Sequence, residues 1–82
     1  MEAFVDLAGK MKAIRRQEGV TQAEFCELVG LSLSTYKKNE ASMFEMGYGP
    51  LSKILNHPRF MKYTLWLMID QVAPECGQIS PE

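Results

Sequence analysis

The sequence has little cysteine or histidine and no long apolar run, and these shortages exclude several classes of protein. Its two cysteines and one histidine, Cys26, Cys76 and His57, form neither a disulfide framework nor the ligand spacing of a metal site. The longest apolar run, residues 65–69, is far shorter than the ~20 residues of a membrane-spanning helix. The N-terminus lacks the basic-then-apolar order of a secretory signal. We therefore expect a protein of the reducing cytoplasm, with no metal ion and no contact with a membrane.

Charge of either sign is not in excess. Nine Lys and Arg residues are balanced by ten Asp and Glu residues, so that the formal net charge is −1. The chain as a whole has no general attraction for nucleic acid, and any DNA-binding surface has to be a local basic patch. A length of 82 residues is enough for one domain with an adequate core.

Patterns typical of catalysis are also missing. The sequence shows no supported Ser/His/Asp or Cys/His arrangement, no glycine-rich phosphate loop and no inward pair of carboxylates. His57 stands beside a proline without a Cys, Asp or Glu at ligand spacing, which favours a plain position at the end of a helix. We expect no enzyme activity, no catalytic residues and no cofactor.

The strongest positive signal is the stretch of residues 21–40, which predicts two short helices with separate start signals. Thr21 and Glu24 form the T-x-x-E pattern of a capping box. Ser32 is placed to cap the second helix, and each such cap typically stabilises a helix by ~1 kcal/mol. Gly30 follows the last apolar residue of the first helix, where a left-handed residue is favoured. The pattern predicts helices over 22–29 and 33–40.

The spacing inside this stretch is that of a helix-turn-helix motif. The small residue Cys26 stands four positions after Gln22, and the turn residue Gly30 stands four positions after Cys26. The core residue Tyr36 stands six positions after Gly30. With the preceding segment IRRQEGVTQ and the closing Glu40, the stretch resembles the lambda-repressor-like, XRE-type helix-turn-helix family.

The resemblance covers residues 11–40 well and residues 43–69 in outline. Two positions depart from it, because the family usually has Ala where Cys26 stands and Ile or Val where Tyr36 stands. The resemblance implies an all-α fold: a compact five-helix, lambda-repressor-like domain with the helix-turn-helix at helices 2 and 3.

The rest of the chain predicts three further helices. Apolar periodicity places them over residues 3–18, 50–56 and 59–71. We expect residues 1–72 to form the DNA-binding domain, including a dimerisation element in helix 5. Residues 73–82, with two prolines and a glycine, predict an irregular C-terminal tail.

The second helix of such a motif enters the major groove with its N-terminal end first. Ser34 can hydrogen-bond a base edge, Leu33 can contact a thymine methyl group, and Lys37 can reach a guanine or a phosphate. The resemblance also implies a phosphate contact from Gln22. The expected DNA-binding residues are Gln22, Ser32, Leu33, Ser34, Thr35, Lys37, Lys38 and Arg16, with Lys10 and Lys12 as further backbone contacts. The simpler alternative is a solvated polar helix without a ligand.

One ion pair is implied by the resemblance. In the family an arginine at the position of Arg15 often pairs with a glutamate at the end of helix 3, here Glu40. The alternative is that both are solvated surface charges.

Helix 5 is apolar on nearly every side, so it has to be buried on nearly every side. One face closes the domain core, and Tyr63, Trp66 and Leu67 then remain as surplus apolar surface. We expect this surface to form a two-fold dimer interface. The alternative is that Trp66 completes the core of the monomer.

These observations predict a sequence-specific, DNA-binding transcriptional regulator of prokaryotic or phage type. We expect a repressor that binds double-stranded DNA as a homodimer on a palindromic operator. The alternative is a protein-interaction module, such as an antitoxin or adaptor, that uses the helix-turn-helix only as a scaffold.

Overall fold

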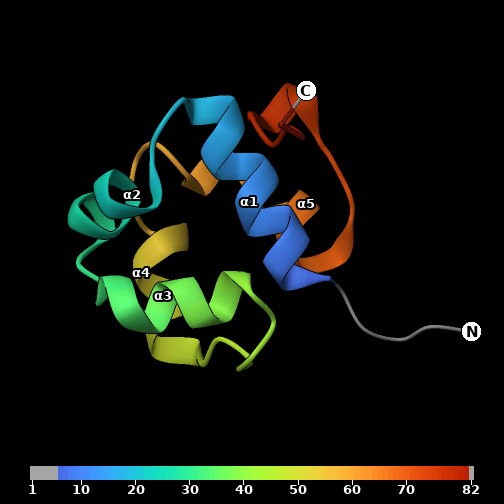
Figure 1. The fold of residues 1–82 in the computed structure, drawn as a ribbon. Coiled ribbons are helices and arrows are strands. Elements are labelled where there is room, and N and C mark those ends of the chain that lie inside the picture. The colour runs from blue at the N-terminus through green and yellow to red at the C-terminus, as the bar shows by residue number, and fades with distance from the viewer. Residues whose placement is uncertain (1–5, 82) are drawn as a thin grey trace, which may run out of the picture.

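The computed structural model describes residues 6–81, which form five α-helices with short connections (Figure 1). The elements are α1 (Leu7–Glu18), α2 (Gln22–Val29), α3 (Leu33–Glu40), α4 (Tyr48–Leu55), the 3₁₀ turn η1 (Met61–Tyr63), α5 (Thr64–Ile69) and the 3₁₀ turn η2 (Pro74–Cys76). The expected all-α, five-helix fold is confirmed. None of the helices within residues 6–81 has the length and apolar character needed to cross a membrane.

Helix α1 lies between the helix-turn-helix and the C-terminal part of the chain (Figure 1). It packs on α3 and on α5, while α2 packs on α3. In the centre of the core, the Phe25 ring lies 5.0 Å from the Tyr36 ring and 4.8 Å from the Phe60 ring, measured between centroids. The buried core residues are Met11, Ile14, Phe25, Cys26, Val29, Tyr36, Ile54, Phe60, Tyr63 and Leu67. This core fixes the motif on α1 and α4.

The two helices of the motif begin and end where local chemistry predicts. The amide of Glu24 donates to Thr21 Oγ1 at 3.1 Å and the amide of Thr21 donates to Glu24 Oε1 at 2.8 Å, which completes the capping box. Gly30 ends α2 with a left-handed φ of 76°. The Ser32 hydroxyl accepts from the amide of Thr35 at 3.5 Å and starts α3. The predicted bounds of both helices are confirmed.

The start of α1 differs from the prediction. Residues 3–5 lie outside the described residues, and Asp6 has a non-helical ψ of 79° and acts as the N-cap of a helix that begins at Leu7. Its carboxylate accepts from the amide of Gly9 at 3.1 Å. A Cβ atom at Gly9 would lie 2.5 Å from Asp6 Oδ2, so a glycine at this position leaves room for the capping carboxylate.

Helix α5 is much shorter than the predicted helix over residues 59–71. The amides of Phe60 and Met61 both donate to the carbonyl of His57 at 3.0 Å, which makes a turn in place of a first helical turn. Helix α5 then has six residues and stops at Asp70, whose φ of 59° is left-handed. The prediction of one continuous helix was wrong because a segment that is apolar on nearly every side carries no signal for its own boundaries.

The tail folds back against the start of α5. Ala73 and Gln78 form a single antiparallel bridge, and the amide of Ile79 donates to the carbonyl of Lys62 at 2.9 Å. The Gln78 side chain accepts from the amide of Leu65 at 3.0 Å and donates to the carbonyl of Met61 at 3.0 Å. Gln78 thereby satisfies one of the first-turn amides of α5, which have no acceptor inside the helix.

Candidate nucleic-acid interface

Helix α3 and its N-cap present the polar face that the sequence predicts for groove contact. Ser32, Ser34, Thr35, Lys37 and Lys38 are exposed, and Tyr36 between them is buried in the core. The hydroxyl oxygens of Ser32 and Ser34 lie 3.1 Å apart, so the two side chains are hydrogen-bonded to each other. Leu33 differs from its neighbours because it is half-buried against the core, which leaves only part of its side chain for a base.

The ion pairs within residues 6–81 do not neutralise the positive charges on this face. They join Lys10 to Asp70, Arg15 to Glu40, and both Arg59 and Lys62 to Glu18. None of these pairs uses Arg16, Lys37 or Lys38, the cations expected at DNA. A near-neutral chain can thus still present basic side chains without acidic partners at its helix-turn-helix.

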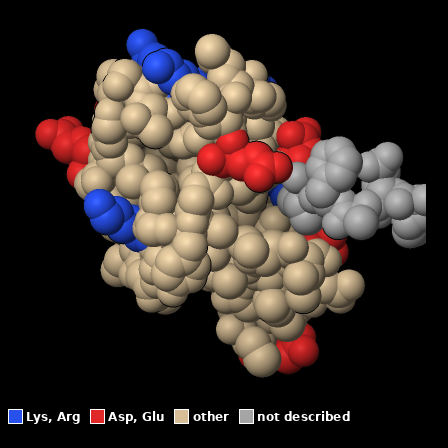
Figure 2. All heavy atoms as spheres, turned by 90° about the horizontal axis from the view of Figure 1, so that it is seen from below, with Lys and Arg blue, Asp and Glu red and all other residues tan. Residues whose placement is uncertain are grey.

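Charge is sparse on the adjoining side of the molecule. On the face seen from below in Figure 2, most of the surface is uncharged, a few Lys and Arg side chains lie toward the edges, and a group of Asp and Glu side chains lies near the middle. Lys38 Nζ lies 5.7 Å from the centre of the Phe44 ring, so this lysine borders the loop after α3.

Lys10, one of the expected backbone contacts, is engaged within the domain. Its Nζ donates to the carbonyl of Trp66 at 2.6 Å and to Asp70 Oδ1 at 2.8 Å, and it lies 4.5 Å from the centre of the Trp66 ring. A cation at the end of a helix stabilises the carbonyl groups that have no intrahelical donor. Lys10 therefore ties α1 to the end of α5.

Arg15 and Glu40 form a bidentate pair beneath the motif. Arg15 Nε donates to Glu40 Oε2 at 2.9 Å, and its Nη2 donates to Oε1 at 3.2 Å. The Glu40 side chain is 3% exposed and also accepts from the hydroxyl of Tyr36. Burial alone would raise the pKa of Glu40, but the hydrogen bonds from Arg15, Tyr36 and Gln22 outweigh it and hold that pKa below its usual value.

Gln22 joins this network from the first position of α2. Its Nε2 donates to Glu40 Oε1 at 3.0 Å, and the residue remains partly exposed. The family resemblance implied a phosphate contact for Gln22 and an ion pair with Arg15 for Glu40. It gave no indication that the side chains of Gln22 and Glu40 contact each other. The i, i+4 spacing of Tyr36 and Glu40 on α3 was a signal for their contact.

Two of the three residues expected at a dimer interface lie in the core instead. Tyr63 is 1% exposed and Leu67 is 0% exposed, so the prediction was wrong for both. The η1 turn points Tyr63 inward, and its hydroxyl donates to Glu18 Oε2 at 2.6 Å. Trp66 is half-buried under Lys10. The apolar residues exposed around α5 are instead Met61, Met68, Ile69 and Val72.

Glu18 is the centre of a second carboxylate network, at the end of α1. Besides Tyr63, it accepts from Arg59 Nε at 3.2 Å and pairs with Lys62 Nζ at 3.0 Å. Burial would raise the pKa of Glu18, but its hydrogen bonds to Tyr63, Lys62 and Arg59 lower it below the usual value. Its partners belong to η1 and the segment before it, so this network does not involve α2 or α3.

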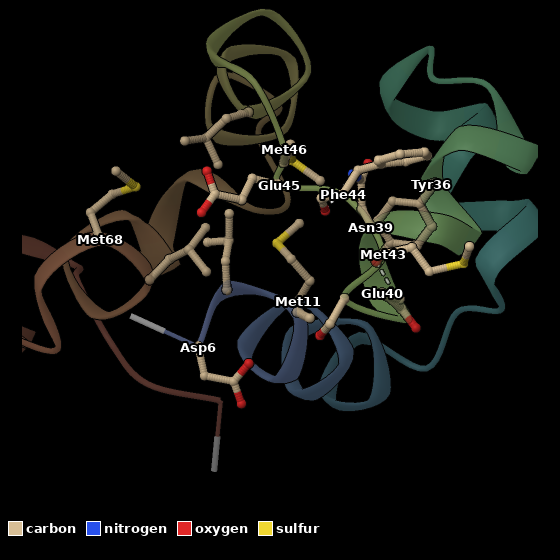
Figure 3. A pocket seen from close by; sticks show the side chains of 15 residues that line it. Asp6, Met11, Tyr36, Asn39, Glu40, Met43, Phe44, Glu45, Met46 and Met68 are labelled. Carbon is tan, nitrogen blue, oxygen red and sulfur yellow. Dashed lines mark hydrogen bonds between the residues drawn. The ribbon is translucent and has the colours of Figure 1, made fainter. Parts of the chain in front are cut away.

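A groove of about 480 Å³ opens beside the C-terminal half of α3 (Figure 3). Met11 of α1 and Met46 of the loop after α3 point toward each other across it, with Met68 of α5 at one end. The loop is held by Asn39, whose Nδ2 donates to the carbonyl of Phe44 at 3.2 Å. The groove adjoins α3 without being part of its exposed polar face.

No family model matches the chain. The chain is 33% identical over 75 residues to "Repressor protein C" of Escherichia phage P2, an alignment that covers 92% of this chain and 76% of that protein. Taken with the five-helix fold and the capped helix-turn-helix, this similarity shows that the chain belongs to the family of phage repressors that includes Repressor protein C.

Proposed function

We propose that this protein is a transcriptional repressor of the XRE type that binds specific double-stranded DNA through α2 and α3. The observation that carries the proposal is the exposed face of α3, where Ser34, Lys37 and Lys38 stand on a helix whose start is fixed by the Ser32 cap. The similarity to Repressor protein C of phage P2 supports repression. Occupancy of an operator is sufficient for such a role.

The expected contacts follow from the exposed positions. Ser34 and Lys37 lie toward the base edges, with Ser32 and the exposed part of Leu33 at the entry end and Thr35 and Lys38 at the margins. Gln22 and Arg16 approach phosphates on either side, where their role is to fix the register of the helix on the duplex.

Selection of bound duplexes from a random pool tests the proposal. We expect one motif to be enriched, and we expect binding to weaken steeply as salt rises, because phosphate contacts release counterions. The rival function, a protein-interaction module such as an antitoxin, predicts no enriched motif. The apolar groove beside α3 is the feature that favours this rival.

Substitutions on the groove face should weaken binding without affecting the fold. We expect Ser34→Ala and Lys37→Ala each to cost ~1–3 kcal/mol of specific binding, the typical loss for a base contact. Both side chains are exposed, so thermal melting should change little. Gel-shift titration on the selected duplex measures the effect. Lys62→Ala is the matched control, since that lysine pairs with Glu18. Unchanged affinity in both variants would assign DNA reading to another surface.

We further propose that the repressor acts as a homodimer on a palindromic operator. Helix α3 has eight residues, so it is only ~12 Å long and reads only a few base pairs. Two such helices held ~34 Å apart read two half-sites. The proposed contact surface is the exposed end of α5, with Met68 and Ile69 at 42% and 58% exposure and Val72 at 48%.

The charged variant Ile69→Lys should abolish dimerisation and leave the monomer folded. Sedimentation equilibrium at micromolar concentration compares it with the parent, and Ile79→Lys in the tail is the control because Ile79 is also exposed. The symmetry of the selected motif is an independent measurement. A parent that is monomeric on its operator, or a motif made of direct repeats, would contradict the two-fold arrangement.

A further inference from the structure

The side-chain amide of Gln22 is held on one side only. Its Nε2 donates one hydrogen to Glu40 Oε1 at 3.0 Å. A primary amide has two N–H groups and one acceptor oxygen, so one donor and the oxygen remain for another partner. Gln22 is the first residue of α2, where the backbone amides of the first turn have no acceptor inside the helix. The partly exposed amide therefore stands among donors suited to an anion.

The carboxylate that holds Gln22 is itself fixed from several directions. Arg15 donates to both oxygens of Glu40, at 2.9 and 3.2 Å, and the hydroxyl of Tyr36 donates to Oε2. Arg15 is braced in turn by its Nη1, which donates to the carbonyl of Val20 at 3.1 Å. The carboxylate cannot rotate without breaking several of these bonds. Its position relative to α1, α2 and α3 is thus determined before any ligand arrives.

We propose that Glu40 is a positioning residue for DNA binding: it holds the amide of Gln22 so that the second N–H meets a phosphate oxygen at the start of α2. The inference rests on the proposed function. Glutamine has three side-chain torsions, and fixing them in the free protein removes an entropy cost that binding would otherwise include. Because Glu40 belongs to α3, the same carboxylate also sets the distance between the phosphate contact and α3, the helix proposed to contact the bases.

Tyr36 strengthens this arrangement. A branched aliphatic residue at this position would fill the core but would give Glu40 no hydrogen. The hydroxyl of Tyr36 instead occupies Oε2, so that Oε1 is shared by Arg15 Nη2 and Gln22 Nε2. Tyr36 thereby acts on Gln22 through Glu40, without touching DNA itself.

A double-mutant cycle on DNA affinity tests the proposal. The proteins are the parent, Gln22→Ala, Glu40→Gln and the double variant, titrated on the selected duplex at a temperature where circular dichroism shows each to be folded. An amide at position 40 has one acceptor oxygen and cannot serve Arg15, Tyr36 and Gln22 together. We expect Gln22→Ala to weaken binding about tenfold and Glu40→Gln about fivefold, as for the loss of one hydrogen bond. In the Gln22→Ala background, Glu40→Gln should change affinity by less than about twofold.

Tyr36→Phe provides a second and milder perturbation. It removes only the hydroxyl that holds Glu40, so we expect a loss of about twofold to threefold that also disappears in the Gln22→Ala background. If Glu40→Gln destabilises the fold too far for titration, Tyr36→Phe with and without Gln22→Ala provides the same test.

Glu18→Gln is the matched control. Glu18 also accepts from a tyrosine hydroxyl and from cationic side chains, but its partners lie near η1. We expect Glu18→Gln to lower stability and leave affinity unchanged within about twofold. Equal losses for Glu40→Gln with and without Gln22, or an equal loss in Glu18→Gln, would overturn the positioning role. Failure of the parent to enrich any DNA would instead remove the proposed function.

Discussion

Glu40→Ala should lower the free energy of unfolding by ~3 kcal/mol or more, the largest expected effect of any polar substitution in this chain. The Glu40 side chain is 3% exposed and accepts hydrogen bonds from Arg15, Gln22 and Tyr36. Its removal leaves the Tyr36 hydroxyl buried without a partner and the guanidinium of Arg15 without its counter-charge. Urea denaturation followed by circular dichroism measures the loss.

A stability cycle shows whether the cost arises from the pair. Arg15→Ala alone leaves the Glu40 carboxylate buried and should also cost ~3 kcal/mol. The double variant removes both charges and should cost clearly less than the sum. Asp70→Asn is the control, because the Asp70 side chain in the pair with Lys10 is 73% exposed, and a pair with an exposed carboxylate is worth ~1 kcal/mol or less. Small and additive effects of Arg15→Ala and Glu40→Ala would mean that the pair stabilises nothing.

Acidification should reproduce part of this loss in the parent. The pKa of Glu40 lies below its usual value of 4.5 in the folded protein, because its hydrogen bonds outweigh the opposite effect of burial. Its contribution to stability is therefore fully present above that value and is lost as pH falls through the lower pKa of the folded state. Glu40→Gln should show a smaller decline between about pH 6 and about pH 3 than the parent does. An identical decline would assign the acid sensitivity to Glu18, whose pKa is lowered as well.

The parts of the fold that depend on neighbouring residues could be predicted from the sequence. Capping by Thr21 and Ser32 and the left-handed turn at Gly30 act within a few residues, and the bounds of α2 and α3 follow from them. The contact between Gln22 and Glu40 joins residues 18 positions apart. No local pattern reveals it, because the distance between two such side chains is set by how the helices pack.

The bounds of helix α5, by contrast, could not be predicted from neighbouring residues. Hydrophobic periodicity assigns a face only when polar residues mark the other face, and residues 59–71 have too few of them. The break at η1 depends on hydrogen bonds to His57 and on the contact of Tyr63 with Glu18, 45 positions earlier. With the break in place, Tyr63 and Leu67 point into the core, and the exposed surface shifts to Met68 and Ile69.

The burial of Leu67 leads to the second large expected effect. Leu67 is 0% exposed and belongs to the core that α5 forms with α1. Replacing a buried leucine by a smaller residue typically costs ~2–5 kcal/mol, and serine adds a hydroxyl that has to find a partner. We therefore expect Leu67→Ser to cost ~3–5 kcal/mol, a large share of the stability of so small a domain.

The neighbouring residue of the same helix supplies the control for this prediction. Met68 is 42% exposed, so Met68→Ser should change the free energy of unfolding by ~0.5 kcal/mol at most, as is usual for surface positions. Urea denaturation of the two variants at several protein concentrations separates a core role from an interface role. A substitution in the core lowers the free energy of unfolding by the same amount at every protein concentration. A substitution in an interface lowers it more as the dimer becomes populated. If Leu67→Ser unfolds like the parent in dilute solution and differs only where the parent dimerises, Leu67 belongs to an interface after all, and the assignment of α5 to the core of the monomer is wrong.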